Sequence, residues 1–382
     1  MANNNDNKVL NVPHLRFPEF SGEWKMCTIG ELITKVGSGV TPRGGEAVYK
    51  TEGHPFVRSQ NVGLGNLLLD DIAFIDEETH LRQKNTELQF NDVLLNITGA
   101  SIGRSALVDK QIVGGNVNQH VCIIRTKENL VPSFICSFLL SNYGQRQIDS
   151  FQAGGNRQGL NFEQIKSIKI TIPSKDEQIK IAKLLRAIDE RIAIQNKIID
   201  KLQSLIKGIA QNVARNNKPN IRLSECLECS SSTLQESDVC KNGTYPVYGA
   251  NGIVGYLDNY NTEKEAVYII KDGSGVGTVS YVTGKCSATG TLNTLQAKEG
   301  YSLQYLYYML KVFNFEPYKT SMAIPHIYFK DYGKAKIFCP SYTEQLKYAR
   351  LLSAIDNKLS AEQSILTDLS LQKQYLLRQM FI

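Results

Sequence analysis

One segment of this 382-residue chain occurs twice, and no other feature constrains the fold as strongly. Ile170 to Asp189 reads ITIPSKDEQIKIAKLLRAID, and Ile337 to Asp356 reads IFCPSYTEQLKYARLLSAID. The proline, the Glu-Gln pair and the Leu-Leu-x-Ala-Ile-Asp ending recur at a constant offset of 167 residues. Solenoid repeats have periods of roughly 20 to 50 residues. A single repetition at this longer distance predicts two large related halves, each ending in the same kind of helix.

Each copy continues into apolar residues that alternate at spacings of four and three, which is typical of a coiled-coil seam. The first seam consists of Ile181, Leu185, Ile188, Ile192, Gln195, Ile199, Leu202, Ile206, Ile209 and Val213. The second, at the same offset, consists of Tyr348, Leu352, Ile355, Leu359, Glu362, Leu366, Leu369, Lys373, Leu376 and Met380. Each predicted helix therefore runs about 38 residues, or roughly 57 Å at 1.5 Å per residue.

Two long helices with matching apolar stripes in one chain are each other's obvious partners. The segment between them is long enough to allow either direction, and we expect an antiparallel pair with one globular unit at each end. In that arrangement Gln195 and Glu362, near the two helix centres, could form a buried polar contact that fixes the register. The alternative is that both side chains are solvated.

Weaker repeats extend upstream at changing offsets. Residues 160–165 match 327–332 at 167, residues 99–103 match 273–277 at 174, and residues 27–32 match 221–226 at 194. The drift in offset indicates that the second unit has lost residues in loops between shared framework elements. Loops commonly carry recognition, so this pattern favours a kept scaffold with a changed binding surface.

Composition excludes some classes of protein. Hydrophobic residues make up 42% of the chain, enough for packed cores, and no run approaches the 18 apolar residues of a membrane span. With no secretory signal in view, we expect a cytoplasmic protein whose eight cysteines are reduced. Cys226-x-x-Cys229 with Cys240 is a weak zinc pattern without a nearby histidine, and buried thiols are the favoured interpretation. We expect no metal and no cofactor.

The chain carries a net charge of +6, which is compatible with a nucleic-acid partner, but it has no run of lysine or arginine. It also lacks the Asn/Asp-Pro-Pro-aromatic motif of adenine methyltransferases. Gly273-Ser-Gly-Val-Gly277 fits neither a dinucleotide-binding loop nor a P-loop. We therefore expect a non-catalytic protein.

Three motifs carry a family resemblance that covers nearly the whole chain. These are Leu15 to Trp24 (LRFPEFSGEW), Tyr245 to Gly255 (YPVYGANGIVG) and the two P-x-x-x-E-Q helix starts at Pro173 and Pro340. They resemble specificity subunits of type I restriction-modification systems. The resemblance implies two target-recognition domains that each read one half of a bipartite double-stranded DNA sequence. It also implies two methyltransferase (modification) subunits and, in the full complex, restriction/translocase subunits as partners.

The fold we expect is α+β, with two α/β target-recognition domains separated by two long helices forming an antiparallel coiled coil. The expected segments are an N-terminal arm (1–24), a first domain (25–173), a first spacer helix (174–216), a second domain (217–340) and a second spacer helix (341–382). The competing interpretation is a coiled-coil interaction scaffold that does not read DNA.

Base readout favours Arg or Lys for guanine and Asn or Gln for adenine, presented on loops. In the first domain the candidates are Arg43, Arg58, Gln60, Asn61, Asn96, Thr98, Ser101, Arg104, Asn116, Asn118, Gln119, Asn156, Arg157 and Gln158. In the second they are Tyr248, Asn251, Lys271, Ser274, Thr289, Thr291, Asn293, Thr320, Ser321 and His326. Arg222 is the only arginine between Pro219 and Pro340. We therefore expect the second half-site to be read with few or no arginine contacts to guanine.

Overall fold

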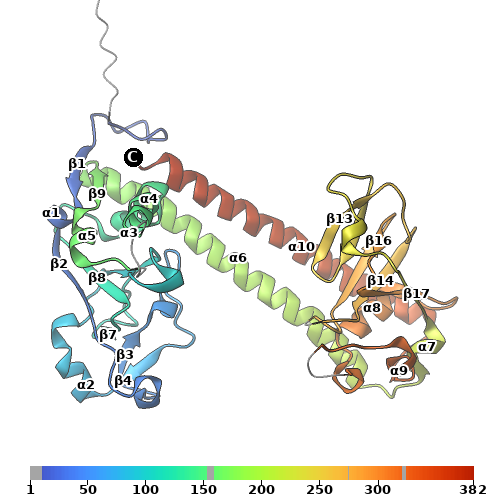
Figure 1. Ribbon diagram of the computed structural model, residues 1–382. Helices are drawn as coiled ribbons and strands as arrows, with labels where there is room; N and C mark the ends of the chain where they lie inside the picture. Colours follow the sequence, from blue (N-terminus) through green and yellow to red (C-terminus); the bar gives the residue numbers. More distant parts are fainter. Residues whose placement is uncertain (1–10, 153–158, 274, 321–323) are drawn as a thin grey trace, which may run out of the picture. The chain divides into compact units, whose positions relative to one another are not determined.

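The computed structural model describes residues 11–152, 159–273, 275–320 and 324–382. The chain forms two compact units (Figure 1). Unit 1 comprises Met1–Gln195 and Ile365–Ile382, and unit 2 comprises Asn196–Ser364. Unit 2 is thus inserted, in sequence, into unit 1.

Unit 1 contains a four-stranded antiparallel sheet in the order β2-β8-β5-β6 and a three-stranded sheet in the order β4-β3-β7, in which β3 and β7 are parallel. A separate pair, β1 and β9, is antiparallel. The strands are β1 (Lys25–Thr28), β2 (Ile33–Ser38), β3 (His54–Val57), β4 (Ala73–Ile75), β5 (Val93–Asn96), β6 (Ser105–Leu107), β7 (Asn116–Val117), β8 (Val121–Thr126) and β9 (Lys169–Ile172).

Short helices join these strands, and α3 packs on β5 and β6. The helices are α1 (Ile29–Leu32), α2 (Glu77–Arg82), α3 (Pro132–Leu140), α4 (Asn142–Ser150) and α5 (Phe162–Ser167), with 3-10 turns η1 (Gly45–Val48), η2 (Ser59–Asn61), η3 (Lys84–Thr86) and η4 (Gly99–Ser101). The main core lies between the four-stranded sheet, α3 and the long helices, where Trp24, Phe134 and Phe381 are buried in one cluster.

Unit 2 repeats this topology strand for strand. Its sheets have the orders β11-β17-β14-β15 and β13-β12-β16, with β12 and β16 parallel, and β10 pairs with β18. Helix α8 packs on β14, β15 and β17 as α3 does on its sheet. The elements are β10 (Ile221–Arg222), α7 (Leu223–Cys226), β11 (Leu227–Ser231), η5 (Glu236–Asp238), β12 (Tyr245–Gly249), β13 (Gly252–Leu257), β14 (Glu265–Ile270), β15 (Val279–Thr283), β16 (Ser287–Ala288), β17 (Leu292–Ala297), α8 (Leu303–Lys311), η6 (Glu316–Tyr318), α9 (Phe329–Tyr332) and β18 (Lys336–Ile337).

The upstream sequence repeats coincide with matching elements. Residues 27–32 and 221–226 each form a strand that runs into a one-turn helix. At both helix starts a glutamate carboxylate accepts the backbone N–H three residues earlier, Thr28 to Glu31 at 2.7 Å and Arg222 to Glu225 at 2.6 Å. Such a contact satisfies an N–H group that a helix start leaves without a partner.

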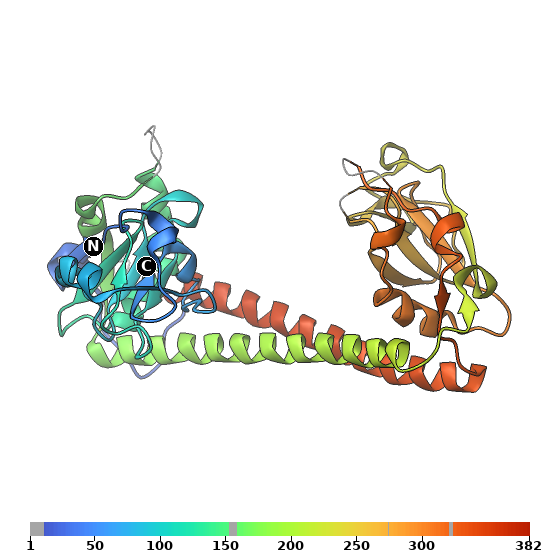
Figure 2. The ribbon, with the colours of Figure 1, turned by 90° about the horizontal axis from the view of Figure 1, so that it is seen from below.

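Two long helices complete the fold, α6 (Lys175–Arg215, 41 residues) and α10 (Tyr342–Gln379, 38 residues), and each is unbroken along its length (Figure 2). In unit 1, Leu185 and Ile188 of α6 share a core with Leu376 and Leu377 of α10. In unit 2 the later half of α6 lies beside the earlier part of α10, where Ile206 and Leu359 line one groove. The start of one helix thus accompanies the end of the other, and the pair is an antiparallel coiled coil.

The seam residues show the burial that the heptad pattern predicts. Leu185, Ile188, Ile199, Leu352, Leu359 and Leu369 are buried, and Ile192, Leu202, Ile355 and Leu366 are half-buried. Gln195 and Glu362 are only 7% and 6% exposed, and Glu362 pairs with Lys358 one turn away. Solvation of these two polar residues is therefore wrong as an alternative, whereas the contact between them stays a prediction.

The P-x-x-x-E-Q motif has a local structural reason. The Oε1 atom of Gln178 accepts the N–H of Val131 just before α3, and its Nε2 donates to the carbonyl of Pro173 at 3.1 Å. Gln345 repeats this arrangement with the N–H of Ser302 before α8 and the carbonyl of Pro340. Each buried glutamine therefore ties the start of a long helix to the helix that covers the sheet.

The N-terminal LRFPEF segment binds to the start of α6. Arg16 donates from Nε and Nη2 to the two carboxylate oxygens of Glu177 at 2.7 and 2.8 Å, and this carboxylate is 1% exposed. The hydrogen bond raises the pKa of Arg16. Lys180 pairs with Glu19 and lies over the ring of Phe17. Glu344, the counterpart of Glu177 in α10, is exposed and accepts from Ser341 instead.

Two further observations concern the described part of the chain. None of its helices has the length and apolar character that a membrane span requires. The three cysteines of the weak zinc pattern differ in exposure, with Cys226 buried, Cys229 half-buried and Cys240 exposed. Burial raises the pKa of Cys226 to about 12 and that of Cys229 to about 11, as expected for inert thiols.

Candidate nucleic-acid interface

Loops from distant parts of unit 1 converge at one edge of its sheets. We call the loops 39–43, 58–61, 96–104 and 116–120 rim 1. Gln119 Oε1 accepts the N–H of Thr41 at 2.9 Å, and Thr98 bonds through its hydroxyl to His120 Nδ1 at 2.5 Å. Asn96 Nδ2 donates to the carbonyl of Ser59 at 2.8 Å. The loops that the sequence singled out are therefore held together.

The corresponding loops of unit 2 also meet. We call the loops 248–251, 271–273, 289–291 and 324–328 rim 2. The N–H of Thr289 donates to the carbonyl of Tyr248 at 2.9 Å, and the N–H of Lys271 donates to Thr291 at 3.0 Å. The imidazole of His326 pairs with the carboxylate of Asp272.

The same backbone hydrogen bonds build both rims. The bond from Ile97 N–H to the carbonyl of His120, 3.0 Å, corresponds to the bond from Lys271 to Thr291. The bond from Asn118 to Val57 corresponds to the bond from Thr289 to Tyr248, and the bond from Leu160 to Ile97 corresponds to the bond from Ile327 to Lys271. Because these partners are main-chain atoms, the framework does not depend on which side chains the loops carry.

Glycines with positive φ occupy a turn at each rim. Gly99 and Gly103 have φ of 71° and 84°, and Gly273 and Gly277 have φ of 92° and 91°, in the left-handed region that favours glycine. The N–H of Gly103 donates to the carbonyl of Asn96 at 3.0 Å, and that of Gly277 donates to Ile270 at 2.9 Å. The glycines at the two ends of each motif therefore have the same left-handed conformation.

The candidate residues that the structure describes fall into three groups by exposure. The exposed ones are Arg43, Gln60, Arg104, Gln119, Asn251 and Thr320. The half-buried ones are Arg58, Thr98, Ser101, Tyr248, Lys271, Thr291 and His326. The buried ones are Asn61, Asn96, Asn116, Asn118, Thr289 and Asn293. Asn156, Arg157, Gln158, Ser274 and Ser321 lie outside the described residues.

The buried candidates have hydrogen-bond partners within their own unit, and their contact with bases stays a prediction. Asn61 donates to Asp71 and to the carbonyl of Leu68, at 2.8 and 2.9 Å. Asn293 bonds to Ser231 and to the hydroxyl of Tyr332, both at 3.1 Å. Amides that are buried and hydrogen-bonded within their own unit support the loops that carry them.

Arg58 is likewise committed within unit 1. Its Nη2 donates to the carbonyl of Asp71 at 2.6 Å, it pairs with Glu46, and its guanidinium lies over the ring of Tyr49. Only 12% of its side chain is exposed. Among the described arginines of rim 1, this leaves Arg43 and Arg104 as exposed cations on loops.

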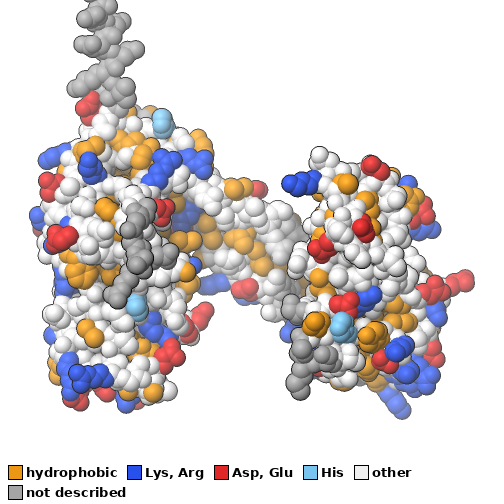
Figure 3. All heavy atoms as spheres, in the orientation of Figure 1, with side chains coloured by type: hydrophobic (Ala, Val, Ile, Leu, Met, Phe, Trp, Pro, Cys, Tyr) orange, Lys and Arg blue, Asp and Glu red, His pale blue; other side chains and the backbone are white. Residues whose placement is uncertain are grey.

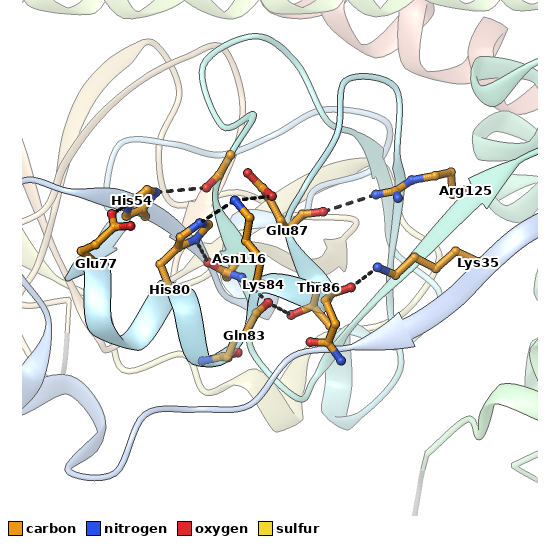
Figure 4. Close-up of polar contacts among 12 residues, drawn as sticks. Lys35, His54, Glu77, His80, Gln83, Lys84, Thr86, Glu87, Asn116 and Arg125 are labelled. Carbon is orange, nitrogen blue, oxygen red and sulfur yellow. Dashed lines mark hydrogen bonds and ion pairs between the residues drawn. The ribbon is translucent and has the colours of Figure 1, made fainter.

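Sequence reasoning missed a polar network behind rim 1 (Figure 4). The rings of His54 and His80 stack with centroids 3.8 Å apart, and His54 Nε2 bonds to Glu77 at 2.6 Å. His80 Nδ1 bonds to Asn116 Oδ1 at 2.7 Å, which anchors β7 at the start of loop 116–120. The hydrogen bond from His54 lowers the pKa of Glu77. No spacing rule links these residues, because they come from β3, α2 and β7.

The surface charge is mixed in sign. On the face drawn in Figure 3, cationic and anionic side chains are interspersed over each unit. Rim 2 carries no arginine in its loops and offers Lys271 and His326 as its basic side chains. The electrostatic difference between the rims therefore comes from a few loop residues.

Comparison with known proteins identifies the family. The model of the type I restriction modification DNA specificity domain matches residues 21–204 and again residues 219–370. A Mycoplasma genitalium protein whose name describes a type I specificity subunit is 25% identical over 315 residues, which span 76% of this chain and 81% of that protein. The EcoKI specificity subunit of Escherichia coli K12 is 22% identical over 202 residues, which span 50% of this chain and 41% of that protein.

Solved structures show the same fold. The crystal structure of a type I restriction-modification S subunit from M. genitalium superposes with a TM-score of 0.67 at 19% identity, covering 97% of this chain and 99% of that one. A chain from a study of complex assembly in a type I restriction-modification system gives a TM-score of 0.53 at 16% identity, with 93% and 96% coverage.

Proposed function

The chain belongs to the type I restriction modification DNA specificity family, and we propose that each of its units reads one half of a bipartite DNA target. Type I specificity subunits recognise DNA and are not catalytic. The proposed target-recognition domains are residues 25–173 and 217–340, linked by spacer helices 174–216 and 341–382. The observation that carries the proposal is the duplicated rim, one set of loops on the same backbone framework in each unit.

Readout at rim 1 uses its exposed polar loops. Arg43 and Arg104 supply the charge and the guanine-type fork, while Gln60 and Gln119 offer amides suited to adenine. Gln119 already bonds to Thr41 and His120, so DNA binding would exchange some of these hydrogen bonds. The buried amides, such as Asn96, hold the loops in position.

Readout at rim 2 follows a different chemistry. Its loops present Lys271, Asn251 and His326, Thr320 is hydrogen-bonded to His326, and arginine is absent from these segments. We expect its half-site to be poor in arginine-read guanine and to be recognised through amides, hydroxyls and DNA shape. Mapping of methylated adenines in DNA modified by the complex gives both half-sites. A guanine-dense second half-site contacted by arginine from unit 2 would contradict this expectation.

The helix pair sets the half-site spacing in this proposal, since a rigid coiled coil makes the distance between two readers a constant. Inserting seven residues at matched points of α6 and α10 keeps both seams in register. The insertion adds about 10.5 Å at 1.5 Å per residue, or roughly three base pairs at 3.4 Å each. An unchanged spacer in the methylated motif would reject this role of the helices.

The partners proposed for the chain are two modification subunits and, in the full complex, restriction subunits. In this proposal the partners carry out methylation and cleavage, and this chain recognises the DNA target sequence. Family membership supports the proposal, and the apolar side chains exposed on α10, among them Leu351, Leu371 and Tyr375, offer surface for docking.

The direct test of DNA reading substitutes the exposed arginines of rim 1. In the complex with the modification subunit, Arg43→Gln and Arg104→Gln should each weaken binding to the specific site, with a loss of about 1–3 kcal/mol where the side chain contacts a base. The slope of log K against log salt should fall by about 0.9 for each phosphate that the variant no longer neutralises. The matched control is Arg82→Gln, because Arg82 is exposed on α2 and paired with Glu78. Equal binding by all three variants would reject rim 1 as the reader.

A further inference from the structure

Among the described residues, unit 2 has a groove at a place that is filled in unit 1. The groove, about 460 Å³ in volume, runs between α6, α8 and α10. Its lining includes Ile206, Lys207, Tyr308, Lys311, Asp356 and Leu359. The Tyr308 hydroxyl donates to Asp356 Oδ2 at 3.2 Å, and Leu359 contributes an apolar floor.

In unit 1 the equivalent place holds a turn of the same chain. Lys373 Nζ donates to the carbonyl of Leu64 at 2.9 Å and pairs with Asp189 at 2.5 Å. The next residue, Gly65, has φ of 100°, and a Cβ there would lie 3.2 Å from both Asp189 Oδ2 and Lys373 Nζ and 3.6 Å from Leu140 Cδ1. The turn at Leu64 and Gly65 therefore rests directly on the long helices and on the end of α3.

The three residues beneath that turn have counterparts that line the groove. At the offset of the helix repeat, Asp189 corresponds to Asp356 and Ile206 to Lys373. Leu140 and Lys311 are the last residues of α3 and α8, nine-residue helices anchored in the same way by Gln178 and Gln345. The groove of unit 2 therefore lies at the position that the turn at Leu64 and Gly65 occupies in unit 1.

A shorter connecting segment explains why unit 2 lacks this turn. Residues 58–92 link β3 to β5 in unit 1, whereas only residues 250–264 link β12 to β14 in unit 2. The segment that carries Leu64 and Gly65 has no equivalent in the shorter link. The position that Lys373 occupies beneath the turn in unit 1 is occupied by Ile206 in unit 2, and Lys207 and Lys311 lie nearby in the groove lining.

We propose that this groove of unit 2 receives a turn of one modification subunit, in the place where unit 1 receives its own turn. The inference rests on the proposed function, from which the partner is taken. The chemistry of the groove defines the turn. Ile206 and Leu359 accept an apolar side chain, and Lys207 and Lys311 accept carbonyl or carboxylate oxygens. A small residue is required at the closest approach, as Gly65 is in unit 1.

The two modification subunits are then held unequally. One gains the groove contact on unit 2, and the other meets a surface where the same position is already filled by Leu64 and Gly65. Blocking the groove should therefore weaken one of the two binding events and leave the other unchanged.

The test fills the groove in the full chain. Ser360 lines the groove and is exposed, so Ser360→Trp places an indole in it, and Asn357→Trp on the same helix outside the lining is the matched control. Titration calorimetry and native mass spectrometry with the modification subunit should show one site weakened at least tenfold for Ser360→Trp. The complex should shift from two bound subunits to one, while Asn357→Trp keeps two.

A second pair of variants guards against misfolding. Lys207→Glu reverses a groove charge without adding bulk. Lys197→Glu is the control, because Lys197 is exposed on α6 and does not line the groove. Two modification subunits bound with unchanged affinity in both Ser360→Trp and Lys207→Glu would overturn the groove as a docking site and leave the DNA-reading proposal intact. An unsubstituted chain that binds no modification subunit would overturn the proposed partnership, and the groove's occupant with it.

Discussion

The buried ion pair between Arg16 and Glu177 should hold the N-terminal segment and the start of α6 together. The Glu177 carboxylate is 1% exposed and receives two charge-assisted hydrogen bonds from the guanidinium, at 2.7 and 2.8 Å. The substitution Arg16→Met keeps much of the aliphatic packing and removes both bonds. The Glu177 carboxylate then stays buried without the guanidinium of Arg16 as its charged partner.

Breaking one side of a buried pair typically costs about 3–5 kcal/mol. Because Arg16 is 17% exposed, water can reach part of the vacated space, and we expect the lower end of that range. In a unit of this size, about 3 kcal/mol lowers the melting temperature by about 6–12 °C.

Intrinsic fluorescence makes the measurement specific to unit 1. Trp24 is the only tryptophan of the chain, is buried, and packs edge-on against Phe134 with ring centroids 6.0 Å apart. Its thermal transition therefore reports unit 1 alone.

Two controls decide whether the reasoning is right. The double variant Arg16→Met with Glu177→Met removes the orphaned charge and should recover at least half of the loss. Glu344→Gln, at the exposed counterpart in unit 2, should leave the Trp24 transition unchanged. The argument is refuted by an Arg16→Met variant that melts within about 1 °C of the unsubstituted chain, or by a double variant no more stable than the single one.

Two further predictions follow from the same helices. Gln178→Ala leaves the part-buried N–H of Val131 without its acceptor and should destabilise unit 1 by about 1–3 kcal/mol. Gln345→Ala should produce a comparable or larger loss in unit 2, because the N–H of Ser302 is buried, and hydrogen exchange detects this loss while the Trp24 transition does not. Burial raises the pKa of Asp189. In the folded protein Asp189 therefore keeps its proton at pH values just above the ordinary aspartate pKa, and its contribution to the free energy of unfolding falls as the pH rises through the raised pKa. Asp189→Asn should therefore flatten the pH dependence of the Trp24 transition just above the ordinary aspartate pKa, and an unchanged slope would contradict the assignment.

The sequence predicted what repeats and missed what is unique to each unit. Heptad spacing located both long helices because apolar periodicity is a local property. The paired glycines 99 and 103, and 273 and 277, share a left-handed conformation that is likewise set locally. Arg16 to Glu177 and Lys373 to Leu64 could not be predicted, because each joins residues separated by 161 or 309 positions.

For the candidate interface, the sequence indicated which loops lie together but not which of their side chains are exposed. The polar, glycine-rich turns that the sequence singled out, where the structure describes them, lie together at each rim. An asparagine that supports a loop and one that could contact a base look alike in sequence, and only burial separates Asn61 or Asn96 from Gln60 or Asn251. Arg58 is similar, since nothing nearby in sequence indicates that Asp71 and Tyr49 surround its guanidinium.

The burial of Phe381 beside Trp24 and Phe134 has a consequence for synthesis on the ribosome. The first unit cannot close its core until about 170 residues of the inserted second unit have been translated and the end of α10 has emerged. At roughly 5–20 residues per second, this delay is on the order of ten to thirty seconds. Throughout it, the apolar face formed by residues such as Ile181 and Leu185 stays uncovered in the nascent chain, so we expect chaperone dependence to be greatest in this interval.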